Sequence, residues 1–220
     1  MTTLLLVRHG ESMANKNHMF IGQTDSPLSE LGIAQAERNA EYIVNNYDVH
    51  RVYASDLKRA FATGKAIADR LGLEVIPEKD LREIHVGIWE MTSFKENYNN
   101  GVQFFLDWES NLGRVVCPEG ESIEYLQKRA SEALIRIAEE NEGKTVVVAV
   151  HATLIRAVQC LFEGKTLDQM NEVPWVPNAS ITTLGYENGR MYVISGGRSD
   201  HLGDLERDAI PKDELLEMKK

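Results

Sequence analysis

Short apolar runs alternate along the chain with longer segments whose apolar residues recur at helical spacing. The clearest runs are Leu-Leu-Leu-Val at 4–7 and Thr-Val-Val-Val-Ala-Val at 145–150. A continuous apolar run of this length is typical of a strand that is buried on both faces of a parallel sheet. Weaker runs, also expected to be strands, lie at 51–54, 73–76, 179–184 and 191–195.

Helices are expected between these strands. Ser29 is a suitable N-cap for a helix that runs to about Asn45, and Asp56 opens a second helix through Arg70 that Gly72 closes. The Asn-Gly pair at 188–189 predicts a hairpin turn between the last two strands. The remaining helices are expected at 122–141 and 153–162.

Three segments have no clear period. Residues 12–28 are polar and are expected to form a long loop, which in a compact domain often carries function. Residues 81–117 mix aromatic residues with asparagines and predict a partly helical cap at about 84–117. Residues 213–220 are expected to form a short surface helix or a frayed end.

The alternation of strands and helices predicts an α/β fold with a mainly parallel sheet. A length of 220 residues favours one domain over 1–220 rather than two small ones. With a formal net charge of −10, the protein lacks the basic field that non-specific nucleic-acid binding needs. The same charge disfavours binding to anionic membranes. Cys117 and Cys160 lie far apart in the sequence, so we expect neither a disulfide framework nor a cysteine zinc site. We therefore expect a cytoplasmic location.

The candidate functional residues lie directly after the predicted strands. Ligand sites of open α/β sheets lie beyond the carboxyl ends of the strands. Arg8 and His9 follow the first strand, Arg59 follows the second, and His151 follows the valine-rich strand just before a helix. Guanidinium groups pair with phosphate, and helix starts favour anions. Each residue alone has an ordinary structural explanation, but their convergence predicts a phosphoryl site.

No metal is expected at these histidines. Neither His9 nor His151 has a second His, Cys, Asp or Glu at the spacing of a known metal motif. We therefore expect neither a metal nor another cofactor.

Four motifs stand in order between Leu4 and about Val158. They are Leu6-Val7-Arg8-His9-Gly10-Glu11-Ser12 with Asn15, Ser55-Asp56-Leu57-Lys58-Arg59-Ala60 with Thr63, Leu81-Arg82-Glu83-Ile84 with Gly87, Trp89 and Glu90, and Val150-His151. Together they resemble the histidine phosphatase superfamily, the phosphoglycerate mutase-like proteins, in its phosphatase branch.

The resemblance implies a three-layer α/β/α sandwich and a reaction without metal. It implies that His9 is the nucleophile and becomes transiently phosphorylated, and that Glu83 donates a proton to the leaving group. The positions that match its catalytic, phosphoryl-binding residues are Arg8, Arg59 and His151. The other expected substrate-binding residues are Asn15, Gly22, Gln23 and Ala152.

Two positions depart from the family pattern. Ala152 stands where the family usually has glycine after its second histidine, and Met91 replaces a glycine that commonly follows the Trp-Glu pair. The methyl group of Ala152 affects the expected shape of the pocket, and Met91 affects that of the following cap segment.

A phosphatase of a small phosphorylated metabolite is the favoured function. A phosphoglycerate mutase must hold a carboxylate as well, and between 84 and 117 the chain has only Lys95 and Arg114 as cations. The mutase and a catalytically weak phosphate-binding module are the alternatives. The oligomeric state stays open, a homodimer included.

Overall fold

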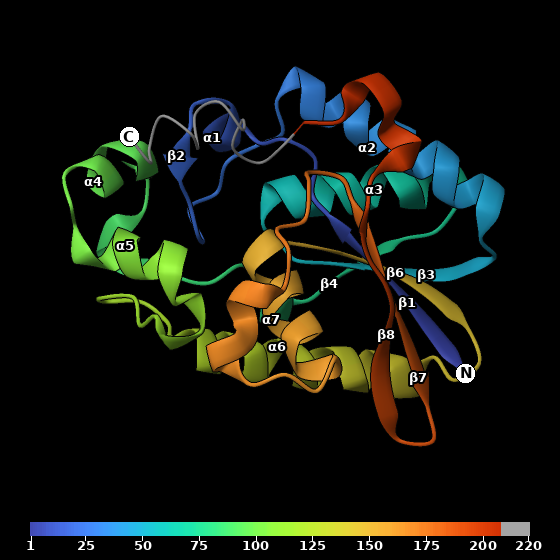
Figure 1. Cartoon of the computed structure of the whole chain (residues 1–220). Helices are drawn as coiled ribbons and strands as arrows, with labels where there is room; N and C mark the ends of the chain where they lie inside the picture. The colour runs from blue at the N-terminus through green and yellow to red at the C-terminus, as the bar shows by residue number, and fades with distance from the viewer. Residues whose placement is uncertain (208–220) are drawn as a thin grey trace.

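A six-stranded sheet forms the centre of the computed structural model, which describes residues 1–207 (Figure 1). The predicted feature at 213–220 lies outside the described residues. The strand order is β4-β3-β6-β1-β7-β8. The strands are β1 (Thr2–Arg8), β3 (Val49–Ala54), β4 (Val75–Pro77), β6 (Thr145–Val150), β7 (Ile181–Glu187) and β8 (Arg190–Arg198).

The sheet is mainly parallel, as the pattern predicts. β4, β3, β6 and β1 run parallel to one another, whereas β7 and β8 form an antiparallel hairpin beside β1. Asn188 and Gly189 both have positive φ at the turn of this hairpin, which is the conformation that an Asn-Gly turn supplies.

Helices cover both faces of the sheet, so the fold has three layers (Figure 1). α2 (Glu30–Asn46) and α3 (Lys58–Leu71) lie on one face, and α6 (Ile123–Glu140) and α7 (Ala152–Phe162) lie on the other. Along β1, Leu4 and Leu6 pack on the side of α6 and α7, while Leu5 and Val7 pack on the side of α2 and α3. Burial on both faces is the reason that the run is wholly apolar.

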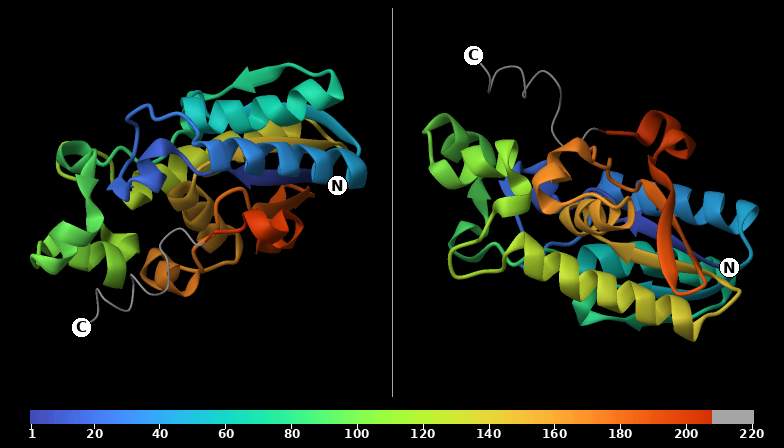
Figure 2. Two further views of the ribbon diagram at one scale, coloured as in Figure 1. Left: turned by 90° about the horizontal axis from the view of Figure 1, so that it is seen from above. Right: turned by 60° about the horizontal axis from the view of Figure 1, so that its bottom comes forward.

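The predicted cap lies at the carboxyl ends of the parallel strands. The green segment of Figure 2 is at the end of the molecule opposite the N terminus in both views. It contains β5 (Thr92–Ser93), α4 (Phe94–Asn99) and α5 (Gln103–Ser110), and β5 pairs with β2 (Met19–Phe20). Phe20 packs against the cap aromatics, with its ring centroid 4.7 Å from that of Trp108 and 5.3 Å from that of Phe105.

The prediction of a loop at 12–28 is partly wrong, because this segment contains α1 (Met13–Lys16) and the strand β2. Ser12 and Asn15 form a reciprocal capping box that stabilises this single helical turn. A helix of four residues has too few apolar positions to show a period, so the pattern missed it.

The second helix begins at Lys58 rather than at Asp56. The Asp56 carboxylate forms two hydrogen bonds of 2.6 Å with Arg82 instead of capping the helix. Asp25, from the 12–28 segment, accepts the Lys58 N–H at 2.8 Å, so the start of α3 is stabilised from a distant part of the chain. The other predicted helices begin and end within one residue of the observed bounds.

Short 3-10 helices join these elements at Lys79–Leu81, Gly87–Trp89, Leu112–Arg114, Leu167–Glu172 and Asp200–Leu205. None of the helices in the described part of the chain combines the length and the apolar character that a bilayer crossing needs.

Candidate active site

The residues that follow three adjacent parallel strands meet at one edge of the sheet. His9 follows β1, His151 follows β6, and Ser55 follows β3. The His9 and His151 rings lie edge to face, with their centroids 5.2 Å apart. His151 Nε2 is 2.9 Å from the Ser55 hydroxyl oxygen, so the three strand ends form one continuous polar cluster.

The hydrogen bonds of His9 fix its tautomer. Nδ1 lies 2.7 Å from the carbonyl oxygen of Gly10, which only accepts, so Nδ1 carries the proton. Nε2 therefore keeps its lone pair, and Arg59 Nε donates to it at 3.3 Å. This geometry presents a neutral imidazole with a nucleophilic nitrogen facing a guanidinium group.

Backbone carbonyls of the 22–24 segment hold Arg59. Its Nη2 donates to Gly22 O at 2.6 Å and its Nη1 to Thr24 O at 3.1 Å. The segment is held in turn by Glu90, whose carboxylate accepts the N–H groups of Gly22, Gln23 and Thr24 at 2.6–3.3 Å. Glu90 thus orders the segment that positions Arg59.

The predicted residue Gly22 lies where a side chain has no space. A Cβ at this position would be 2.2 Å from the carbonyl oxygen of Ile84. Its neighbour Gln23 donates from Nε2 to the Glu83 carbonyl oxygen at 3.0 Å. The two residues therefore join the 22–24 segment to the segment that carries Glu83.

The buried Glu83 carboxyl group spans from its own loop to the start of α7. One oxygen accepts the Ile84 N–H at 2.9 Å and the other accepts the Thr153 N–H at 3.0 Å. Because Thr153 is two residues after His151, the carboxyl group lies beside the second histidine.

Arg8 is buried with an incomplete set of partners. Its Nη1 donates to Val176 O at 2.5 Å, whereas its Nε is buried without a partner among the described residues. Burial lowers the pKa of Arg8 to about 10, against the opposing charge of Glu83. Buried N–H groups are rarely left unpaired, so Arg8 is ready to bind an acceptor.

Both histidines are neutral in this environment. Burial, followed by the charges of Arg59 and Arg8, holds the pKa of His9 well below its ordinary value of 6.5. Burial and Arg59 do the same to the pKa of His151, whose Nδ1 has no partner among the described residues. The site is therefore a buried cluster of two guanidinium groups and two neutral imidazoles, which suits an anion.

The sequence comparison decides the family. The sequence model of the histidine phosphatase superfamily (branch 1) matches residues 4–196. The chain belongs to the histidine phosphatase superfamily.

Similar proteins of this superfamily include phosphatases and mutase-like proteins. Phosphoglycerate mutase-like protein 4 of Arabidopsis thaliana is 33% identical over 193 residues, which are 87% of this chain and 82% of that protein. The metal-independent phosphoserine phosphatase of the same plant is 31% identical over 206 residues, 93% of this chain and 84% of that protein.

Solved structures share the whole fold. Bacillus stearothermophilus YhfR matches 92% of this chain and 100% of its own, with a TM-score of 0.84 and 28% identity. A phosphoserine phosphatase of Entamoeba histolytica in complex with 3-phosphoglyceric acid matches 92% of this chain and 100% of its own, with a TM-score of 0.78 and 31% identity. The expected phosphoglycerate mutase-like α/β fold is thus confirmed.

The two departures from the superfamily pattern have different consequences. Ala152 is the first residue of α7, a helical position that alanine favours. Met91 has a φ of 59°, in the left-handed region that favours glycine, and its N–H donates to Phe20 O at 2.8 Å. Of these two departures, Met91, directly before β5, therefore carries left-handed backbone strain, whereas Ala152, beside His151, does not.

Asn15 lies close to the site but is engaged in local structure. Its side-chain oxygen accepts from the N–H and the hydroxyl of Ser12 and, at 3.4 Å, from Asn178 Nδ2. Asn178 Nδ2 also donates to the His9 carbonyl at 3.2 Å, as does the Ala179 N–H at 3.1 Å. The 178–179 segment therefore fixes the backbone of His9, which no motif indicated.

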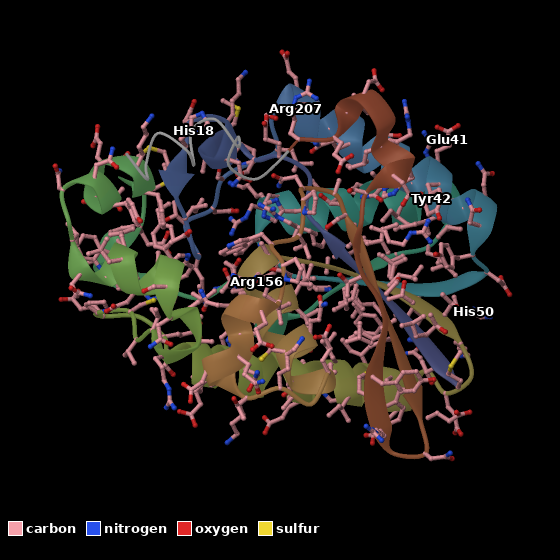
Figure 3. The ribbon with its side chains drawn as sticks, in the orientation of Figure 1. His18, Glu41, Tyr42, His50, Arg156 and Arg207 are labelled. Atoms are coloured by element: carbon pink, nitrogen blue, oxygen red, sulfur yellow. The ribbon has the colours of Figure 1, made fainter. Side chains whose placement is uncertain are left out.

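Arg156, on α7, is a third buried arginine near this edge of the sheet (Figure 3). It donates to Val173 O and Met170 O, and its guanidinium carbon lies 4.1 Å from the centroid of the Trp175 ring. The segment that Arg156 holds continues to Val176, the partner of Arg8. Arg156 thus orders backbone that borders the site.

Several site-supporting residues escaped prediction because their contacts cross long stretches of sequence. Asn178 lies 169 residues from its partner His9. Glu90 belongs to the third motif, but the motif gives no indication that it binds the 22–24 segment. No group of three or more His, Cys, Asp or Glu side chains within residues 1–207 could hold a metal ion.

Proposed function

We propose that the chain is a metal-independent phosphatase that hydrolyses a small phosphomonoester through a phosphohistidine on His9. The observation that carries the proposal is the unprotonated Nε2 of His9, held by the Gly10 carbonyl on the other side of the ring and facing Arg59. The relatives named phosphatases support the hydrolytic outcome.

In the first step, the Nε2 lone pair of His9 attacks phosphorus and the ester P–O bond breaks. The leaving oxygen keeps the electron pair of the broken bond and takes a proton from the Glu83 carboxyl group. Arg8, Arg59 and His151 stabilise the charge that spreads over the three equatorial oxygens, which is the main requirement of phosphoryl transfer.

In the second step, water attacks the phosphohistidine. The Glu83 carboxylate accepts a proton from the water, the P–N bond breaks, and its electron pair returns to Nε2. Inorganic phosphate leaves, and the enzyme regains its starting protonation. The buried, unpartnered Arg8 Nε and His151 Nδ1 are positions where phosphate oxygens would complete the hydrogen bonding.

We further propose that the segment at 84–117 is the cap of a single domain and helps to select the substrate. Its aromatic side chains pack around Phe20, which belongs to the same segment as Gly22. Arg114, one of the two cations that a mutase could use there, pairs with Asp168 at the surface. This pairing favours a phosphatase over a phosphoglycerate mutase.

The proposed substrate is a small phosphorylated metabolite, with phosphoserine and 3-phosphoglycerate as the first compounds to test because a similar structure binds the latter. A cytoplasmic location agrees with the two cysteines, Cys117 and Cys160, which are buried and unpaired.

The direct test is phosphate release in chelator-treated buffer from a panel of phosphomonoesters that includes phosphoserine and 3-phosphoglycerate. Wild type is expected to release phosphate and His9→Ala to release none, with an unchanged circular dichroism spectrum. Formation of 2-phosphoglycerate without phosphate release would establish the mutase instead. The absence of both products would leave only the binding module.

A further inference from the structure

Arg129, on α6, uses every one of its N–H groups on the segment that carries Glu83 and on that segment's support. Nη1 donates to the carbonyls of Asp80 and Arg82 at 2.7 and 2.8 Å, and Nη2 donates to the carbonyl of Glu83 at 3.0 Å. Nε and Nη2 donate to the two carboxylate oxygens of Glu121 at 3.1 and 2.9 Å. A guanidinium group has five N–H donors, and all are occupied.

Glu121 extends the contact to the other side of Glu83. Its Oε2 accepts the His85 N–H at 3.0 Å, and its own N–H donates to the His85 carbonyl at 2.8 Å. The Arg129 side chain is only 9% exposed. The pair therefore fixes the backbone on both sides of Glu83 from the interior of the protein.

The position of the Glu83 carboxyl group depends on this backbone. Its two oxygens join the 80–85 segment to the Thr153 N–H at the start of α7. A displacement of the segment would move the carboxyl group relative to His9, although neither Arg129 nor Glu121 touches that histidine. In general, misplacing a reacting group by about 1 Å costs about 10²-fold in rate.

We propose that Arg129, with Glu121, is a positioning residue for proton transfer from Glu83 to the leaving group. This inference rests on the proposed function, in which Glu83 is the proton donor. Lysine cannot replace Arg129 here, because an ammonium group has three donors and lacks the planar arrangement that binds a carboxylate through two parallel hydrogen bonds.

The test compares kcat/KM for an alkyl phosphate, phosphoserine, with kcat/KM for p-nitrophenyl phosphate, whose leaving group needs little protonation. The readout is the ratio of the two values on one preparation, which does not change with the folded fraction. Arg136→Lys is the matched control, because Arg136 also joins α6 to the start of this segment, through Glu78 at 2.5 Å, but at the surface.

Arg129→Lys is expected to raise the ratio of p-nitrophenyl phosphate to phosphoserine by about tenfold or more, Glu83→Gln to raise it further, and Arg136→Lys to leave it unchanged. An unchanged ratio in Arg129→Lys beside a raised ratio in Glu83→Gln would overturn the positioning role. An unchanged ratio in Glu83→Gln would remove the proton-donor assignment, and the positioning role with it.

A second variant covers the case in which Arg129→Lys does not fold. Glu121→Gln keeps the shape of the side chain and weakens one of the two parallel hydrogen bonds. It is expected to shift the ratio in the same direction by a smaller factor. No shift in Glu121→Gln would then overturn the proposal.

Discussion

Arg59 Nε donates a hydrogen bond to Nε2 of His9 across 3.3 Å, while the opposite nitrogen of the same ring donates to the Gly10 carbonyl. The first contact places a cation where a phosphoryl group would bind, and the second keeps the ring in the tautomer that has its lone pair there. Arg59 is itself held by the 22–24 segment, so the reactivity of His9 depends on residues that never touch it.

Glu90→Gln is expected to lower kcat/KM by about 10- to 100-fold. The glutamine amide would place an NH₂ donor where a Glu90 oxygen now accepts a backbone N–H. The 22–24 segment would then no longer hold Arg59 in place. The measurement is steady-state kinetics on phosphoserine, with Glu96→Gln on α4 as an exposed control. Equal activity in the two variants would contradict this role.

Asn39→Leu is expected to destabilise the fold by about 1–3 kcal/mol. Asn39 is fully buried on α2, donates to the Ala179 carbonyl at 2.7 Å and lies 2.7 Å from His201 Nε2, so leucine leaves that carbonyl unpaired. Urea unfolding is the measurement. Asn46→Leu, at the exposed end of the same helix, should change the free energy of unfolding by less than about 0.5 kcal/mol, and a similar loss in both would count against the assignment.

The pH dependence of kcat/KM for p-nitrophenyl phosphate, whose leaving group needs little protonation from Glu83, should be broad. In the proposed reaction neutral His9 is the reactive form, and its pKa lies well below 6.5, so activity should persist to pH values below 6.5 as the pH falls. On the alkaline side, Arg8 has a pKa of about 10, and its deprotonation there should weaken substrate binding.

The substrate itself titrates near pH 6, since a phosphomonoester has a second pKa of about 6. The profile must therefore be expressed per concentration of the dianion, with the substrate pKa measured separately by phosphorus NMR. An acid limb that remains at pH 6.5 after this correction would show that His9 has an ordinary pKa.

Met91→Gly should be neutral or should stabilise the protein by about 1 kcal/mol, because it removes left-handed strain from a half-exposed side chain. Met13→Gly is the comparison, because Met13 is similarly exposed but helical. Glycine there should lower the free energy of unfolding by about 1 kcal/mol. Thermal unfolding of both variants decides the matter. The idea fails if Met91→Gly is as destabilising as Met13→Gly.

The elements of the central layers could be predicted because burial determines composition. Val146, Val147 and Val148 lie in a strand covered on both faces, and no polar residue could occupy those positions without an unpaired group. The same logic located His9 and His151, since parallel strands end at the same edge of the sheet.

The supporting network could not be predicted, because its members look like surface residues in the sequence. Arg129 stands among charged neighbours on α6, and only the fold reveals that it reaches the Glu83 backbone 46 residues away. The helix at 13–16 depends on a capping box and not on periodicity, and the start of α3 depends on Asp25, 33 residues from its partner Lys58.

In the proposed reaction, His9 carries the phosphoryl group through Nε2. The most direct measurement is rapid quenching of the enzyme with a phosphomonoester under alkaline conditions, where phosphohistidine survives, followed by peptide mass spectrometry and phosphorus NMR. We expect a phosphorylated peptide that contains His9, substituted at Nε2 and formed at least as fast as turnover. Phosphorylation of His151 instead, or turnover without any phosphorylated histidine, would contradict it.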